Sequence, residues 1–370
     1  MKSDILYWLW YSRVRGLTIE VKLKLLEHVA SPEYLFKGAD KNLPDYIAPE
    51  IKRTLKEQAT LANLEKYVRI AERQDYQITT YFDYEYPEML TQIDKPPLVL
   101  FYKGNLDCLK RRCIAVVGTR RASEKGLYHA RSFSREFAGN GFTVVSGLAR
   151  GIDSAAHIGA MSTGATCAVL GCGVDVVYPP ENREIYEAIC QEGAVISEYL
   201  PGVQPQKWHF PQRNRIISGL SESVVLIEAP ERSGALNTIN HAAEQNRDVY
   251  VLSDRLDTYE CAGNRMLLEE GAVPVTTPYD IIESDSFTAY DGVQSLKKPR
   301  AENIKEDKKE YHSFSEPEAK LMKAIRRGKK QFDEIILESG LKASEAGYLL
   351  TMLEFKGIIR QMPGKVYEER

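Results

Sequence analysis

Cysteine is scarce in this sequence, and no two cysteines stand at a spacing typical of a metal site. The six are Cys108, Cys113, Cys167, Cys172, Cys190 and Cys261, and none of them forms a C-x-x-C pair. A structural zinc site is therefore not expected. Six cysteines in 370 residues also argue against a disulfide framework, which is typical of short secreted chains. We expect reduced thiols and no bound metal.

Long apolar runs and an excess of charge of either sign are also missing. No segment approaches the ~18 apolar residues of a membrane-spanning helix, and no signal peptide is recognisable. The 49 basic and 52 acidic side chains give a net charge of -3, which excludes a protein that is basic all over but not a locally basic cleft. These absences predict a cytoplasmic protein with no membrane partner. With 43% hydrophobic residues, the chain can build a core in each of two or three domains.

The hydrophobic pattern changes along the chain and predicts three domains. Residues 1–85 have apolar residues at helical spacing and predict a small domain of the SAM or helix-hairpin-helix type. In residues 86–284, short and nearly all-apolar strands alternate with helices, which predicts an α/β fold: an extended Rossmann-like, doubly wound parallel sheet. Residues 285–313 are charged and read as a linker. Residues 314–370 predict three helices and a hairpin, the outline of a winged helix.

Glycine and arginine follow the first predicted strands of the sheet. The first strand ends in Gly118-Thr119-Arg120-Arg121, and the second is followed by Gly147, Arg150 and Gly151. Glycines at such turns let a ligand approach the backbone, and the helices that follow present free N–H groups to anions. Arginine can grip a phosphodiester with two parallel hydrogen bonds. Because neither G-x-G-x-x-G nor a P-loop is present, we expect a phosphate-binding rim without a dinucleotide cofactor.

The segment from Gln206 to Leu220 interleaves cations and aromatic residues. Within it stand Lys207, Phe210, Arg213, Asn214 and Arg215, with Trp208 and His209 between them. Cations bind phosphates and aromatic faces stack on bases, so the cluster favours binding of single-stranded nucleic acid. The alternative is a loop whose aromatic residues fill the core while the arginines form internal ion pairs.

Motifs for catalysis are missing. No G-x-S-x-G, no H-E-x-x-H and no zinc deaminase signature occurs, and His157 reads as a structural residue. Glu228 and the turn at residues 233–238 either bind a ligand or cap the next helix. The sequence therefore predicts no catalytic residue and no cofactor.

Four ordered segments resemble the DNA-processing protein A (DprA, or Smf) family. They are Gly118-Thr119-Arg120, residues 146–157, residues 170–179 and residues 209–221. The resemblance implies a non-enzymatic protein that binds single-stranded DNA and loads the RecA recombinase in recombination and natural transformation (competence). It also implies a homodimer and contact with single-strand-binding protein. The candidate DNA-binding residues are Gly118, Arg120, Arg121, Gly147, Arg150, Gly151, Lys207, Phe210, Arg213, Asn214 and Arg215.

An enzyme is the competing hypothesis. Lysine-decarboxylase-like phosphoribohydrolases share a related Rossmann core and cleave the N-glycosidic bond of nucleoside monophosphates. Their P-G-G-x-G-T-x-x-E signature is missing here, so the likeness rests on the fold alone.

Overall fold

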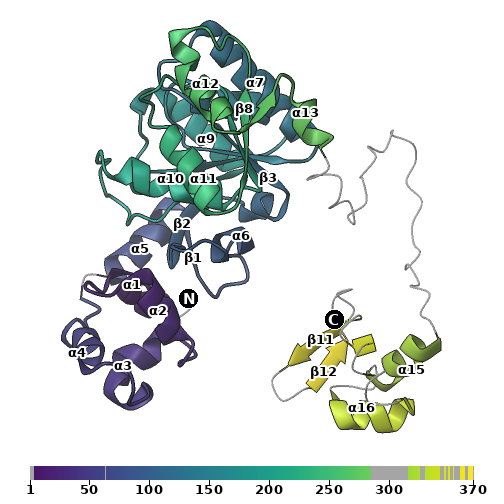
Figure 1. Cartoon of the computed structure of the whole chain (residues 1–370). Coiled ribbons are helices and arrows are strands. Elements are labelled where there is room, and N and C mark those ends of the chain that lie inside the picture. Colours follow the sequence, from purple (N-terminus) through teal and green to yellow (C-terminus); the bar gives the residue numbers. More distant parts are fainter. Residues whose placement is uncertain are drawn as a thin grey trace. The chain divides into compact units, whose positions relative to one another are not determined.

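The chain forms two compact units, Met1–Ser295 and Leu296–Arg370 (Figure 1). The computed structural model describes residues 4–62 and 64–284 of the first unit. In the second it describes residues 316–325, 330–341, 346, 349–350, 353, 359–362 and 366–369. The predicted linker, residues 285–313, lies outside the described residues. None of the described helices is long and apolar enough to cross a membrane.

Among the described residues, five helices open the first unit, as the apolar spacing predicts. They are α1 (Ile5–Arg13), α2 (Ile19–Leu26), α3 (Pro32–Asn42), α4 (Pro49–Glu57) and α5 (Glu65–Gln74). Their core is rich in aromatic side chains, because Trp8, Trp10 and Tyr11 of α1 are all buried. The hydroxyl of Tyr11 donates to the Lys22 carbonyl at 2.7 Å, which ties α1 to α2.

A nine-stranded sheet follows, in the order β1-β2-β6-β5-β4-β3-β7-β8-β9. The seven strands from β6 to β9 in this order run parallel, whereas β1 and β2 pair antiparallel at one edge. The strands are β1 (Gln77–Thr80), β2 (Val99–Gly104), β3 (Cys113–Val117), β4 (Thr143–Ser146), β5 (Thr166–Val169), β6 (Ala194–Ser197), β7 (Ser223–Leu226), β8 (Asp248–Leu252) and β9 (Val273–Val275).

The sheet begins upstream of the boundary predicted near residue 85. Strand β1 is a short edge strand, and its sequence Gln77-Ile78-Thr79-Thr80 carries one aliphatic side chain, so it gives no clear strand pattern. Its pairing with the apolar β2 attaches the N-terminal helices to the sheet. The formation of this strand therefore depends on long-range pairing with β2 and not on local strand propensity.

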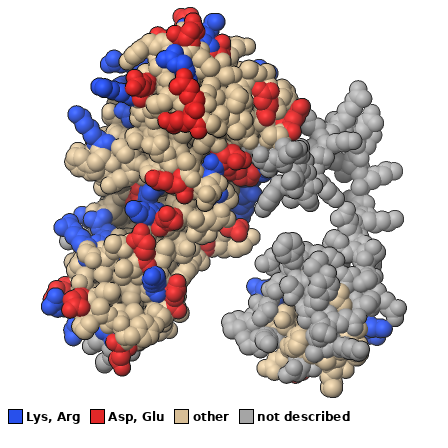
Figure 2. Space-filling view, in the orientation of Figure 1, with Lys and Arg blue, Asp and Glu red and all other residues tan. Residues whose placement is uncertain are grey.

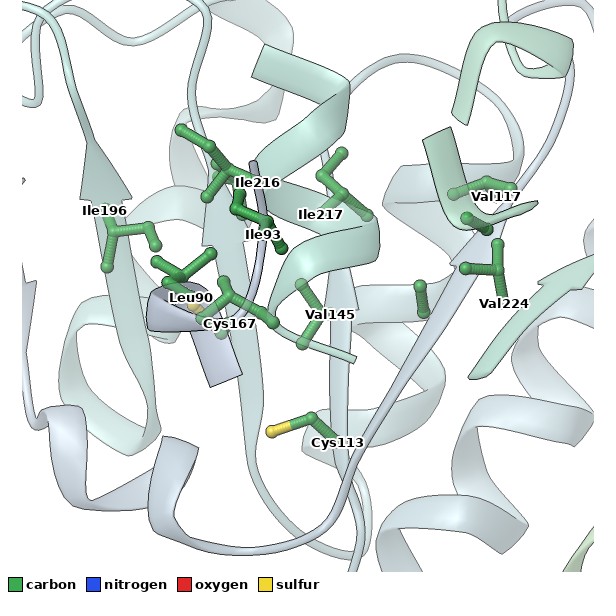
Figure 3. Packing of buried hydrophobic residues seen from close by; sticks show 14 of the residues in the cluster. Leu90, Ile93, Cys113, Val117, Val145, Cys167, Ile196, Ile216, Ile217 and Val224 are labelled. Atoms are coloured by element: carbon green, nitrogen blue, oxygen red, sulfur yellow. The ribbon is translucent and has the colours of Figure 1, made fainter. Parts of the chain in front are cut away.

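Helices cover both faces of the sheet, so the predicted doubly wound architecture is confirmed. One face packs against α6 (Glu88–Thr91), α10 (His209–Gly219), α11 (Leu236–Glu244) and α12 (Ala262–Glu269). Figure 3 shows this packing, with Leu90, Ile216 and Ile217 over Val145, Cys167 and Ile196. The other face packs against α7 (Glu124–Gly139), α8 (Ile152–Met161), α9 (Arg183–Glu192) and α13 (Tyr279–Ile282). In the part of the chain that the structure describes, three short 3-10 helices lie in the connections: Leu106–Lys110, Pro180–Asn182 and Tyr259–Cys261.

The second unit agrees with the predicted winged helix where it is described. It contains α15 (Glu316–Ile325), α16 (Phe332–Ser339) and a three-stranded sheet of β10 (Lys330–Gln331), β12 (Val366–Glu369) and β11 (Ile359–Met362). Of the third predicted helix, residues 343–354, the structure describes four residues, all helical and three of them fully buried: Ala346, Leu350 and Leu353.

Candidate nucleic-acid interface

Helix α10 starts at the carboxyl ends of β4 and β5. His209 Nδ1 lies 3.1 Å from the carbonyl oxygen of Gly171, which follows β5. A Cβ on Gly171 would stand 3.0 Å from the Phe210 ring, so this glycine lets the aromatic side chain lie directly against the turn. The predicted segment at residues 207–215 and the glycine-rich strand ends therefore meet at one edge of the sheet, the edge where doubly wound sheets bind ligands.

Arg213 points into the protein. It is 3% exposed, and its Nη1 donates to the carbonyl oxygens of Gly147, at 2.9 Å, and of Val169. Asp153 is buried beside it: Nη2 of Arg213 and Oδ2 of Asp153 lie 2.6 and 2.7 Å from the point that a Cβ on Gly147 would occupy. Burial raises the pKa of Asp153, while the guanidinium of Arg213 opposes that shift. The arginine thus joins the ends of β4 and β5 and balances a buried carboxylate.

Arg215 and Arg150 also have partners within the chain. The guanidinium of Arg215 donates through both Nη atoms to Glu198, at 2.8 and 2.7 Å, and through Nε to the Lys95 carbonyl at 3.0 Å. Arg150 forms an exposed ion pair with Glu181. Asn214 donates weakly, at 3.4 Å, to the Gly234 carbonyl. For Arg213 and Arg215, the geometry therefore matches the alternative of internal pairing that the sequence left open.

The glycines of the strand ends make room for the chain itself. A Cβ on Gly118 would lie 2.5 Å from Cγ1 of Ile152, and one on Gly151 would lie 2.4 Å from the Thr119 carbonyl oxygen. Gly151 also has φ of +75°, a conformation that disfavours other residues. Packing between the two turns therefore requires glycine at these positions, whether or not a ligand binds there.

The exposed part of the edge is built around Phe210. The guanidinium carbon of Arg120 lies 4.8 Å from the centre of the Phe210 ring, a cation–π distance, and the ring of Tyr178 lies 5.7 Å away. Arg120, Arg121 and Lys207 are all exposed. We call Arg120, Tyr178 and Phe210, together with Lys207, which precedes Phe210 by three residues in the chain, the edge cluster. It combines cations that can bind phosphates with aromatic faces that can stack on bases.

Sequence reasoning did not select Tyr178 or Trp208 as site residues. Tyr178 stands in the loop after β5, and its place beside Phe210 depends on the fold. Trp208 is 62% exposed next to Phe210, which a core-filling aromatic residue would not be. The signal available for both was an aromatic side chain in the segment that follows a parallel strand at the ligand edge of the sheet.

Glu228 occupies the place at which a nucleotide phosphate binds in many Rossmann enzymes. The sheet order puts the switch point between β3 and β7, next to the first turn of α7. There the carboxylate of Glu228, 2% exposed, accepts hydrogen bonds from the backbone N–H of Ser123, at 2.8 Å, and from the Ser123 hydroxyl. Ser123 is the N-cap of α7, and its hydroxyl oxygen accepts from the Gly126 N–H at 3.1 Å, so Glu228 holds in place the residue that caps this helix N-terminus. Of the two interpretations open for Glu228, the structure supports a capping role, but at α7 and not at the next helix in the chain, α11.

The fold and the edge define a class: Rossmann-like α/β proteins whose sheet edge carries exposed cations and aromatic rings. Among the described residues, no group of His, Cys, Asp and Glu could hold a metal ion. The chain belongs to the DNA recombination-mediator protein A family, whose model matches residues 77–285. The model of the DprA winged helix domain matches residues 305–365. The family consists of DNA-processing proteins that act in recombination.

Curated relatives span the chain. Protein Smf of Synechocystis is 32% identical over 400 aligned positions, covering 100% of this chain and 99% of the relative. DNA processing protein DprA of Streptococcus pneumoniae is 38% identical over 285 residues, covering 76% of this chain and 98% of the relative.

Two solved structures share the fold. The X-ray structure of DprA from S. pneumoniae has a TM-score of 0.64 at 36% identity, covering 75% of this chain and 97% of that one. The second is the structure of DNA processing protein A from Helicobacter pylori, which is described by its single-stranded DNA binding mode. It has a TM-score of 0.52 at 30% identity, covering 56% of this chain and 94% of that one.

Proposed function

We propose that this protein binds single-stranded DNA at the edge cluster and delivers the strand to a RecA-type recombinase. The observation that carries the proposal is the placement of the exposed Arg120 over Phe210, with Tyr178 beside it. The relative from H. pylori, which is described by its single-stranded DNA binding, supports the choice of ligand. In this role Arg120, Arg121 and Lys207 contact phosphates, and Phe210, Tyr178 and Trp208 offer faces to the bases. Arg213 and Arg215 hold the edge in place without touching the strand.

The proposed role requires no chemical step. Glu228 caps α7 at the position where a nucleotide-processing enzyme of this fold would hold its substrate phosphate. A carboxylate there repels a second anion, which disfavours the phosphoribohydrolase hypothesis. Incubation with nucleoside monophosphates tests this directly, because release of free base would contradict a binding protein.

The partners and the setting are part of the proposal. We propose a cytoplasmic homodimer that loads RecA onto strands covered by single-strand-binding protein, including strands taken up in natural transformation. The test is RecA filament assembly on such covered strands, with and without this protein. Stimulation that Arg120→Ala abolishes supports loading, and equal assembly in both reactions contradicts it.

Replacing either exposed cation of the edge cluster should weaken binding at all sequences. We expect Arg120→Ala and Lys207→Ala each to reduce the slope of log K against log salt by about 0.7, the effect of one lost phosphate contact on a single strand. Arg135→Ala is the matched control, because Arg135 is exposed on α7 more than three turns beyond Arg120. If all three variants and the parent have the same slope of log K against log salt, the phosphates are bound elsewhere than at the edge cluster.

Deletion of residues 311–370 should leave the affinity for single-stranded DNA within about threefold, less than ~0.7 kcal/mol. The third helix of the winged helix, residues 343–354, carries two glutamates and no Lys or Arg, so it presents no positive charge to a polyanion. We propose that this domain binds protein or regulates the first unit. A tenfold loss in binding isotherms of the truncated chain would contradict that role.

A further inference from the structure

A pocket of about 690 Å³ lies between the N-terminal helices and α10, and no residue of the edge cluster lines it. Its walls come from α1, α2, the segment at residues 95–99 and the outer side of α10. Figure 2 shows the surface hollowed between the N-terminal helices and the sheet, with Lys and Arg side chains near the recess. The volume lies in the range of pockets that bind small molecules.

Positive charge dominates the polar part of this pocket. Four cations line it, Arg13, Lys22, Lys95 and Arg215, against one carboxylate, Glu198. Glu198 is already engaged by both Nη atoms of Arg215. The three remaining cations therefore have no carboxylate within the lining, although Glu20, outside it, is close enough to Lys95 for a weak electrostatic interaction.

Lys22 is the most unusual of these cations, because it is 6% exposed and has no ion-pair partner among the described residues. Its Nζ donates to the Ser12 carbonyl at 3.0 Å, which leaves further donor capacity. Burial lowers the pKa of Lys22 to about 8. A buried ammonium without a carboxylate is costly, and an anion in the pocket would relieve that cost.

Most of the rest of the lining is apolar, and its other polar side chains are Ser12, Gln212 and His241. The apolar lining includes Pro96, Pro97, Leu98, Phe101 and Leu200, all of them buried. Inorganic phosphate alone would leave this surface uncovered. The combination fits an anion attached to a planar apolar body, and the volume suits a body of nucleoside size.

We propose that this pocket is a second binding site, for a nucleoside phosphate, with the phosphate on Lys22, Arg13 and Lys95 and the base against Pro96 and Pro97. As a site for a free nucleotide, the pocket is independent of the proposed function at the edge cluster; as a site for part of a bound strand, it rests on that function. It shares α10 with that cluster, because Pro211, Gln212 and Arg215 face the pocket while Phe210 and Arg213 face the sheet edge. The nucleotide is either free or part of a bound strand that continues past α10.

The test is calorimetric titration of the full chain with AMP, adenosine and inorganic phosphate. We expect AMP to bind with Kd on the order of 10–100 µM, and adenosine and phosphate each at least about tenfold more weakly. Lys22→Met should weaken AMP binding by at least about tenfold, since it removes a charged donor and keeps the apolar stem. Lys24→Met is the matched control, because Lys24 is exposed on the same helix and outside the pocket. Lys95→Gln changes a surface residue and should also weaken AMP binding. It provides the test in case Lys22→Met does not fold.

A second titration with AMP, of the chain saturated with oligothymidylate, distinguishes a free nucleotide from a nucleotide of a bound strand. Retained AMP binding assigns the pocket to a free nucleotide. If AMP binding is lost, and Lys22→Met also binds oligothymidylate more weakly, the pocket holds a nucleotide of the bound strand. The proposal is overturned if AMP binds no better than adenosine or phosphate, or if neither Lys22→Met nor Lys95→Gln weakens it. Failure of the wild-type chain to bind oligothymidylate would instead overturn the proposed function alone.

Discussion

Replacing Arg213 with methionine is expected to lower the free energy of unfolding by about 3–5 kcal/mol, the cost of leaving a buried charge without its partner. The guanidinium donates to two backbone carbonyls at the ends of β4 and β5, and it lies beside the buried Asp153. Methionine fills the space of the stem but supplies neither the donors nor the charge. Denaturant unfolding of the full chain measures the effect.

A double variant separates the charge from the packing. In Arg213→Met/Asp153→Asn no buried carboxylate is left unpaired, so part of the lost stability should return. In the folded fraction of Arg213→Met, the salt dependence of DNA binding should equal that of the parent. A stable single variant with a reduced salt slope would show that Arg213 contacts phosphate.

Phe210→Ala is expected to weaken binding of single-stranded DNA by about 1–3 kcal/mol, which corresponds to roughly 5- to 150-fold. The ring lies under Arg120 and beside Tyr178, so its removal takes away a stacking face and leaves the cations in place. The salt slope should therefore change little. Binding isotherms at several salt concentrations measure both quantities.

Two further variants test whether Phe210 stacks or only fills space. Phe210→Leu keeps an apolar side chain against Gly171 but has no aromatic face, so its affinity should fall nearly as far as that of the alanine variant. Tyr46→Ala is the control, because Tyr46 is a 74% exposed aromatic residue in the turn between α3 and α4. Normal affinity in Phe210→Leu with lower stability in Phe210→Ala would assign Phe210 to packing.

The sequence by itself determined the fold class and the edge of the sheet that holds the candidate site. The strands at residues 113–117, 143–146 and 166–169 are short, apolar and separated by amphipathic helices, and these are local patterns. The carboxyl ends of parallel strands meet at one edge, so the turns at Gly118 and Gly147 could be placed together without a structure. The mixture of cations and aromatic residues in the segment from Lys207 to Arg215 was equally readable.

Only the tertiary structure decided which of those side chains are available to a ligand. Successive residues of a helix point about 100° apart. The burial of Ile216 and Ile217 against the sheet therefore fixes the direction of every other side chain on α10. That orientation sends Arg213 inward to two carbonyls and Arg215 to Glu198, and it leaves Phe210 at the edge under Arg120. A list of residue types contains no such direction, because it depends on contacts between segments far apart in the chain.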